Sequence, residues 1–142
     1  MMLRKVLIDT NVYVAWLNGG RHDEVMLGLG RVRYLSGVVH MELRAGAKGL
    51  PARRALDQLV RAYRAAERLI LPTDEIFEAA GKVLLRLRAG GREIRRASLV
   101  NDVLIALCAR SIGASVVTSD SDFEHIRSVV PFHLETVPIA GE

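Results

Sequence analysis

Short apolar runs alternate with longer stretches of helical spacing along this chain. Residues 4–8 have a continuous apolar centre, which is typical of a parallel strand covered on both faces. Further short strands are predicted at residues 32–35, 69–71, 114–117 and 132–137. Helical spacing between them predicts helices at residues 12–18, 22–29, 36–47, from 51 onward, 73–89 and 98–112, with a short helical turn at 123–127. This alternation predicts an α/β fold in which helices flank a mostly parallel five-stranded sheet.

Capping residues and glycines mark the expected helix ends. Ser36 and Thr73 precede helical stretches as N-caps, and Pro51 suits the first turn of a helix. Gly19-Gly20 and Gly113 follow helical stretches, where glycine commonly ends a helix.

The length and composition restrict the class of protein. A chain of 142 residues suits one domain, residues 1–142, and half of the residues are hydrophobic, which argues against disorder. The single cysteine, Cys108, excludes an internal disulfide and a thiolate zinc site. No apolar run is long enough to span a membrane and no signal peptide is visible, so we expect a cytoplasmic protein with no membrane partner.

Four segments, residues 6–11, 38–43, 101–106 and 116–123, place an acid at the border of an apolar run. A carboxylate beside a buried element is costly unless a cation meets it. Several such acids that converge in the fold would suit a hard divalent metal ion. The acids are Asp9, Glu42, Asp102, Asp120 and Asp122.

Asp9 and Asp120 both follow predicted strands. Ligands of open α/β sheets bind beyond the carboxyl ends of the strands, where the strand order reverses, so we expect both acids at this edge. Asp9 alone would also be explained as a helix N-cap, because Asp-Thr-Asn is good capping chemistry. The recurrence of a strand followed by an acid favours a common site.

Glu42 and Asp102 are predicted on helices. Residues three and four positions from Glu42 are apolar or small, so Glu42 extends from a stripe that should pack inward. Asp102 shares its face with Ala106 and Ala109, which would let its helix approach the sheet closely. The alternatives are a structural ion pair for Glu42 and a helix-dipole contact for Asp102, with Ser98 as the N-cap. The presence of the other acids favours the site.

The segment from Thr118 to Phe123 is the most distinctive short motif. Its acids, Asp120 and Asp122, lie one residue apart in a loop that leaves a strand, so both could face one cation. Asp-Ser pairs are also ordinary turn formers, which leaves the role of Asp122 open. Thr118 could orient a carboxylate by a hydrogen bond or simply begin the turn.

Taken together, these segments resemble the PIN-domain ribonucleases, especially the small VapC-type toxins of bacterial and archaeal toxin–antitoxin pairs. No single motif is highly specific, but the ordered set is strong and spans nearly the whole chain. The resemblance implies a three-layer α/β PIN-like fold, and it gives Asn11 a supporting role and Asp122 a less uniform one. It implies an acidic site formed by Asp9, Glu42, Asp102 and Asp120. The matching pieces are Ile8-Asp9-Thr10-Asn11, residues 36–43, Asn101-Asp102 with Ile105-Ala106, and residues 118–123.

A site made of carboxylate oxygens favours Mg²⁺ or Mn²⁺ over zinc or copper, and none of the four histidines has zinc-ligand spacing. We expect Asp9 and Asp102 to be direct ligands. Glu42 and Asp120 would bind metal through water, complete a second metal site or position the attacking water. The resemblance implies endonucleolytic cleavage of RNA that leaves a 5′-phosphate, although the residues alone would suit DNA equally.

The charge balance is compatible with a polyanionic substrate. The formal net charge is +4, from 20 basic and 16 acidic residues, and setting aside the five clustered acids leaves 11 acids against 20 bases. An acidic pocket on a basic body suits a nuclease, although basic proteins are common and charge alone decides nothing. Five arginines around Gly90-Gly91 could hold the RNA backbone, or form a solvated helix end that the dipole favours. They are Arg86, Arg88, Arg92, Arg95 and Arg96.

The resemblance also implies two protein partners. VapC-type toxins bind a cognate antitoxin, which places an arginine in the acidic pocket and a helix in a groove between toxin helices, and they form homodimers. Six apolar residues could line such a groove here, although each could equally belong to the core or a dimer contact. They are Trp16, Leu17, Met26, Leu29, Leu50 and Leu56.

Three other functions are weighed against this one. A haloacid-dehalogenase-like phosphatase would need an acid where Asn11 stands and a catalytic lysine that is hard to place among the three lysines of the chain. An RNA-processing nuclease without an antitoxin would share every motif. A non-catalytic PIN-like scaffold would normally have lost site acids, and none of the main four is missing.

Overall fold

One parallel sheet organises the chain in the computed structural model, which describes residues 3–94 and 96–139. The strand order is β3-β2-β1-β4-β5, and every neighbouring pair is parallel. The predicted α/β class and five-stranded sheet are therefore confirmed. The strands are β1 (Arg4–Ile8), β2 (Arg31–Ser36), β3 (Leu69–Ile70), β4 (Ser115–Thr118) and β5 (His133–Thr136).

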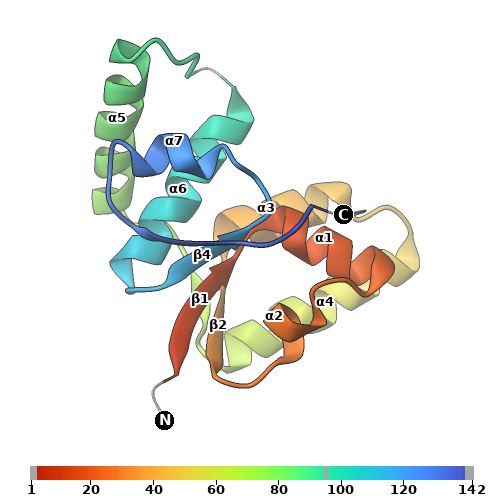
Figure 1. Ribbon diagram of the computed structural model, residues 1–142. Helices are drawn as coiled ribbons and strands as arrows, with labels where there is room; N and C mark the ends of the chain where they lie inside the picture. Colours follow the sequence, from red (N-terminus) through yellow and green to blue (C-terminus); the bar gives the residue numbers. More distant parts are fainter. Residues whose placement is uncertain (1–2, 95, 140–142) are drawn as a thin grey trace.

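Helices cover both faces of the sheet, as Figure 1 shows, with α5, α6 and α7 on one side and α1, α2 and α4 on the other. Helix α3 begins directly after β2 and contacts both α1 and α6. The three-layer arrangement agrees with the expected fold. The described helices are α1 (Thr10–Gly19), α2 (Asp23–Leu27), α3 (Gly37–Gly46), α4 (Leu50–Ala65), α5 (Asp74–Ala89), α6 (Ala97–Ser111) and α7 (Phe123–Arg127). None of them is long and apolar enough to cross a membrane.

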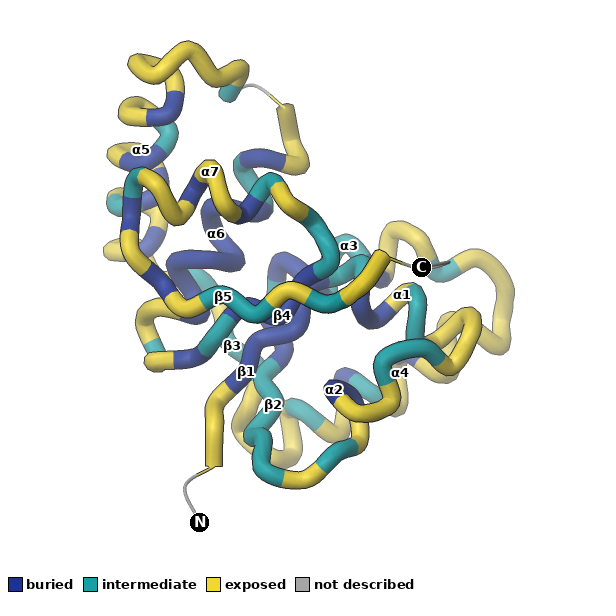
Figure 2. Tube along the Cα trace, viewed as in Figure 1, coloured by how far each residue is buried: buried dark blue, intermediate teal, exposed yellow. Residues whose placement is uncertain are grey.

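The core is built around β1 and α6. Val6, Leu7 and Ile8 of β1 have no exposed surface, because helices cover both faces of the central strand. Each such side chain contributes about 1.5–3 kcal/mol through its burial. Figure 2 shows the buried residues concentrated in β1, β4 and α6. An acidic residue beside these elements therefore stands next to low-dielectric surroundings.

Most predicted helix ends are confirmed, and one is wrong. The Ser36 hydroxyl accepts a hydrogen bond from the Val38 backbone at 3.0 Å, and Gly20 ends α1 in a left-handed conformation with φ 66°. Ser98, however, is not the N-cap of α6. The carbonyl of Arg96 closes the first turn by accepting from the Leu99 and Val100 backbone, so Ser98 lies inside the helix.

The strand order places a crevice at the carboxyl end of β1. The chain starts at the centre, moves outward through β2 to β3, and returns to the other side of β1 as β4. The order therefore reverses between β1 and β4, and open α/β sheets bind ligands at this kind of position. Asp9 follows β1 and Asp120 follows β4, at the edge where they were expected.

Candidate active site

Asp9 is both a helix cap and a buried acid. One carboxylate oxygen accepts from the Thr10 backbone N–H at 2.9 Å, and the other accepts from the Thr118 hydroxyl at 2.7 Å. Only 4% of its surface is exposed. Burial raises the pKa of Asp9 to about 6, although both hydrogen bonds lower it, and the charges of Glu42 and Asp120 raise it further.

The Thr118 hydroxyl joins the loop after β4 to Asp9. It donates to Asp9, accepts from the Asp120 backbone N–H at 2.9 Å, and lies 3.5 Å from the Asn11 amide nitrogen. The side-chain amide oxygen of Asn11 in turn accepts a hydrogen bond from the Ser119 backbone N–H at 3.3 Å. Thr118 is fully buried, so this network fixes the loop and the Asp9 side chain together.

Because the sequence predicts that Asp9 binds metal, we expect Thr118→Val to lower the predicted cleavage activity by about 10–100-fold, the usual cost of losing a group that orients such a ligand. Valine keeps the shape but leaves one Asp9 carboxylate oxygen and the Asp120 backbone N–H without a partner. Loss of the hydrogen bond should also raise the pKa of Asp9 further, which NMR titration can measure. Thr118→Ser restores the hydroxyl and should retain most of the activity. Equal activity in Thr118→Val and wild type would contradict this role.

Glu42 is held in place by two polar residues that were not predicted as site residues. The Thr10 hydroxyl donates to one of its carboxylate oxygens at 2.7 Å, and the Asn101 amide donates to the other at 3.4 Å. Thr10 and Asn101 each stand directly beside a predicted acid in the sequence, and this adjacency was the available signal. Three separate elements, α1, α3 and α6, therefore meet at Glu42.

The pKa of Asp102 is raised further than that of Asp9, the other buried acid of the cleft. Asp102 lies in α6 with 8% of its surface exposed, and burial raises its pKa to about 8. The charges of Asp9, Asp120, Glu42 and Asp122 raise it further, in that order of size. Among the described residues, no lysine or arginine forms an ion pair with the main four acids. The cluster is therefore destabilised by its own charge unless a cation is bound.

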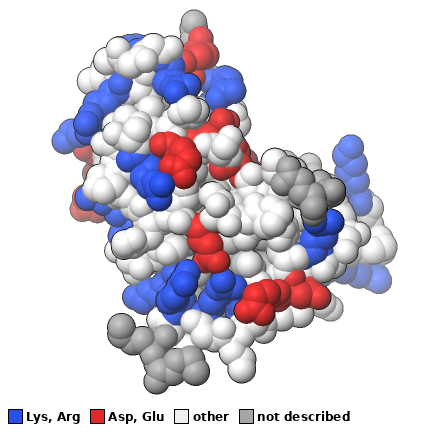
Figure 3. Space-filling model, viewed as in Figure 1, with Lys and Arg blue, Asp and Glu red and all other residues white. Residues whose placement is uncertain are grey.

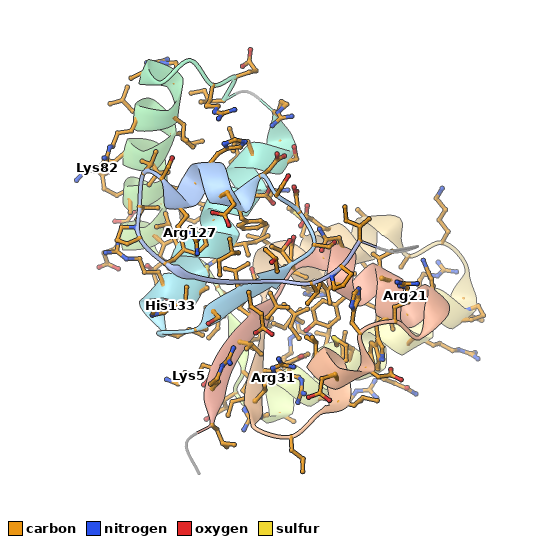
Figure 4. All side chains as sticks on the ribbon, in the orientation of Figure 1. Lys5, Arg21, Arg31, Lys82, Arg127 and His133 are labelled. Carbon is orange, nitrogen blue, oxygen red and sulfur yellow. The ribbon has the colours of Figure 1, made fainter. Side chains whose placement is uncertain are left out.

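One cleft of about 650 Å³ brings the four main acids together. Figure 3 shows acidic side chains in the hollow between the part of the molecule formed by α6 and α7 and the part formed by α1. Arg21, which follows the end of α1, also lines the cleft and is labelled in Figure 4. The acids that line the cleft are Asp9, Glu42, Asp102 and Asp120.

Asp122 lies at the border of this cluster and does not line the cleft. Its backbone N–H donates to the Asp120 carboxylate at 2.9 Å, which is the turn geometry that Asp-Ser sequences favour. Its side chain is exposed to solvent and lies 3.9 Å from the Arg96 guanidinium. Asp122 therefore contributes negative charge near Asp102 but points into the neighbouring pocket that Arg96 also lines.

Two further arginines predicted to hold RNA already contact acceptors of the protein. The Arg86 guanidinium donates to the Val129 carbonyl at 2.9 Å, and the Arg92 guanidinium lies 2.7 Å from the His125 ring nitrogen Nδ1. These contacts tie α5 and the following loop to the region of α7. The predicted set also includes Arg88, which is exposed, and Arg95, which lies outside the described residues.

The chemistry of the cleft fits Mg²⁺ or Mn²⁺. Its lining offers carboxylate, hydroxyl and amide oxygens but no histidine or cysteine, and hard cations prefer such donors. As the side chains stand, no three or more of the described acids, histidines and cysteines are arranged closely enough to hold an ion. Instead, one carboxylate oxygen of Asp9 and one of Glu42 each accept a hydrogen bond from a neighbouring hydroxyl group.

Comparisons with known proteins identify the fold. The model of the PIN domain matches residues 6–129, and no curated protein sequence matches the chain. VapBC2 from Rickettsia felis, bound to a DNA fragment from its promoter, has a TM-score of 0.68 and 20% identity, covering 94% of this chain and 98% of that one. VapBC-5 from Mycobacterium tuberculosis, a member of the VapBC family of toxin–antitoxin systems, has a TM-score of 0.66 and 23% identity, covering 95% and 98%.

A third similar structure is FitAcB from Neisseria gonorrhoeae, with a TM-score of 0.68 and 21% identity over 91% of this chain and 95% of that one. These likenesses show a shared fold over nearly the whole chain. The PIN model alone spans most of the chain, from β1 to the end of α7. The predicted family is thereby confirmed, and this chain belongs to the PIN domain family.

Proposed function

We propose that this protein is a metal-dependent endoribonuclease that hydrolyses RNA phosphodiester bonds and acts as the toxin of a toxin–antitoxin pair. One observation carries the proposal. Four carboxylates, from the end of β1, α3, α6 and the loop after β4, line a single cleft, and none of them forms an ion pair with a described lysine or arginine. Membership of the PIN family and the toxin–antitoxin structures of the same fold support the finer assignment.

Asp9 and Asp102 would hold Mg²⁺ or Mn²⁺, because they are the two buried acids of the cleft. Bound metal supplies an activated water and stabilises the charge that develops on the phosphate. Thr118 keeps Asp9 oriented toward the cleft, while Thr10 and Asn101 hold the Glu42 carboxylate. Glu42 is thereby placed to accept a proton from an attacking water or to bind metal through water.

The antitoxin is the proposed protein partner. The similar structures are themselves VapBC and FitAcB complexes. A groove of about 370 Å³ between α1, α3 and α4 suits an amphipathic helix and shares Glu42 with the acidic cleft. Leu17 is exposed along it, and Leu56 borders it but belongs to the core, as Met26 does; Leu29 is 94% exposed outside the groove.

A homodimer and a cytoplasmic location remain predictions, as does the organisation of residues 1–142 as one domain. An RNA-processing nuclease without an antitoxin is the main competing function, since it would use the same acids. A short antitoxin-like reading frame immediately upstream of the gene would favour the toxin. A scaffold without catalysis would retain its effect on a host cell when the acids are neutralised.

Expression in host cells tests the proposal. Wild-type protein should arrest growth and yield a discrete RNA cleavage product when 5′ ends are mapped, and Asp9→Asn should abolish both. Glu78→Gln, at an exposed position of α5, serves as the matched control and should behave as wild type. Identical RNA ends in cells that express wild type and Asp9→Asn would rule out this nuclease site. Cleavage without growth arrest would favour RNA processing.

A further inference from the structure

Arginines gather on the outer face of α4. Residues 44–68 hold seven of the 20 basic residues of the chain but only two of its 16 acids. Arg53, Arg61 and Arg64 follow one another at helical spacing and therefore share a face, with Arg54 at its border. Two further cations complete this surface, which we call the α4 arginine face. It comprises Arg53, Arg54, Arg61 and Arg64, with Lys48 before the helix and Arg68 after it, all exposed.

These side chains are available for a ligand. Within residues 3–94 and 96–139, none of the six has a side-chain hydrogen bond or an ion pair. Asp57 lies in the same helical row, but its carboxylate is engaged by Arg44 of α3 at 2.7 Å. By contrast, Arg86 and Arg92 of the loop predicted from the sequence already contact acceptors of the protein. The α4 arginine face therefore gathers six exposed cations that no described side chain engages.

The α4 arginine face lies next to the active cleft. The groove between α1, α3 and α4 shares Val14, Asn18 and Glu42 with the cleft, and its far wall is the first half of α4. Arg53 and Arg54 lie in the sequence between Ala52 and Ala55, which line that wall. Figure 1 shows α4 on the α1 side of the sheet, and Figure 3 shows basic side chains at the right-hand edge, where α4 begins. A strand that leaves the cleft over the groove would reach these cations.

The composition of the face favours a phosphate backbone over an acidic protein. Five of its six cations are arginines, whose planar guanidinium matches phosphate oxygens in pairs. The other exposed positions between Arg53 and Arg64 are two alanines, Gln58 and the already paired Asp57, so this stretch offers no large apolar side chain to anchor a protein partner. Arg53 and Arg64 lie about 17 Å apart along the helix axis, which matches about five phosphates of a nucleic-acid strand.

We infer that the α4 arginine face is a docking surface for the phosphate backbone of the nucleic acid whose scissile bond enters the acidic cleft. The inference rests on the proposed nuclease function for the identity of the strand in the cleft. Contact with the backbone carries no sequence information, so this surface adds affinity and orientation, while selection of the cleavage site belongs elsewhere.

Fluorescence anisotropy with a labelled 20-nucleotide RNA tests the inference, in an Asp9→Asn background that leaves the probe uncut. Across 50–200 mM NaCl, each lost contact with a single strand should lower the salt-dependence slope by about 0.7. Arg61→Gln/Arg64→Gln should therefore lower it by about 1.4. The fourfold variant that adds Arg53→Gln/Arg54→Gln should lower it by about 3 and raise Kd about tenfold or more.

A variant of equal charge on the other side of the molecule is the control. Lys82→Gln/Arg110→Gln removes two exposed cations, and Lys82 lies on α5, away from α4 in Figure 4. It should leave the slope unchanged. Equal slopes in wild type and the fourfold variant would overturn the inference, as would tighter binding of a polyglutamate peptide than of RNA. A duplex DNA of the same length distinguishes an RNA-selective surface from a general backbone surface.

Cleavage kinetics separate this inference from the proposed function. With Asp9 intact, the fourfold variant should raise KM for a 20-nucleotide RNA about tenfold and leave kcat for a tetranucleotide unchanged, because only the longer strand reaches α4. If the wild type cleaves no RNA, the proposed nuclease function is wrong, and the binding measurements still test the α4 arginine face as a docking surface. Equal KM values for the long RNA would reject the surface while the nuclease stands.

Discussion

Asp102→Asn should make the protein more stable and at least a thousandfold less active. We expect the activity to fall because Asp102 is a proposed direct metal ligand, and an amide cannot replace an anionic ligand there. The stability rises because the Asp102 carboxyl is buried among like charges, with its pKa raised to about 8. At pH 8.5 we expect a gain on the order of 3 kcal/mol, or about 10 °C in Tm, measured by thermal denaturation.

The opposite directions of these two effects make the prediction specific. A variant that lost activity through unfolding would also have a lower Tm. Loss of cleavage together with a higher Tm therefore cannot come from unfolding. Glu78→Gln, which removes an exposed acid of α5, should change neither quantity. If Asp102→Asn kept more than a tenth of wild-type cleavage, its place as a direct ligand would be wrong. A lower Tm at pH 8.5 would show that the carboxylate is favourable where it stands.

Without divalent metal, the protein should lose stability as the pH rises from about 4 to 8.5. The folded-state pKa values of Asp9 and Asp102, about 6 and about 8, both exceed the usual value of 3.8, so the folded state binds more protons than the unfolded state between these limits. Stability must then fall as the pH rises through that interval, because ionisation is costlier in the folded chain. We expect Tm to decrease by about 10 °C or more between pH 5 and pH 8.5.

Mg²⁺ or Mn²⁺ should reverse this loss at high pH. A cation that occupies the cleft at one hundred times its Kd would restore about 2.7 kcal/mol, and the effect should shrink toward pH 5, where the carboxyl groups are protonated. Sodium chloride at the same ionic strength is the control. Asp102→Asn should respond little to the metal and show a weaker dependence on pH. Equal Tm values with and without Mg²⁺ at pH 8.5 would contradict the metal site.

Local patterns were sufficient to predict most elements of the fold. The predicted strand at residues 4–8 coincides with β1, and the hydroxyl groups of Ser36 and Thr73 cap α3 and α5 as expected. The prediction of Ser98 as the cap of α6 was wrong because the capping preference of serine does not determine where the helix begins. The helix begins after Arg96, which caps it without a side-chain hydrogen bond. The order of the strands depends on pairing between distant segments, which apolar periodicity does not encode.

The four acids of the cleft were predicted because each borders an apolar run, where an unpaired charge is costly. The residues that hold them were harder to find, since Thr10 and Asn101 have ordinary roles until α1, α3 and α6 meet at Glu42. The α4 arginine face was missed for a related reason. Exposed arginines on helices are common. Whether the charge of such an arginine remains available depends on whether neighbouring acids pair with it, and the sequence does not show this.

The hydrogen bond between Thr118 and Asp9 joins residues 109 positions apart. During translation, β1 is made first, but its neighbour β4 and the acids Asp102 and Asp120 follow only near the end. A nascent chain that stops before β4 lacks Asp120 and the Thr118 hydroxyl that orients Asp9, and it leaves one edge of the central strand unpaired. Enzymatic activity should therefore appear only when synthesis is nearly complete, so that prematurely terminated chains are inert and prone to aggregate.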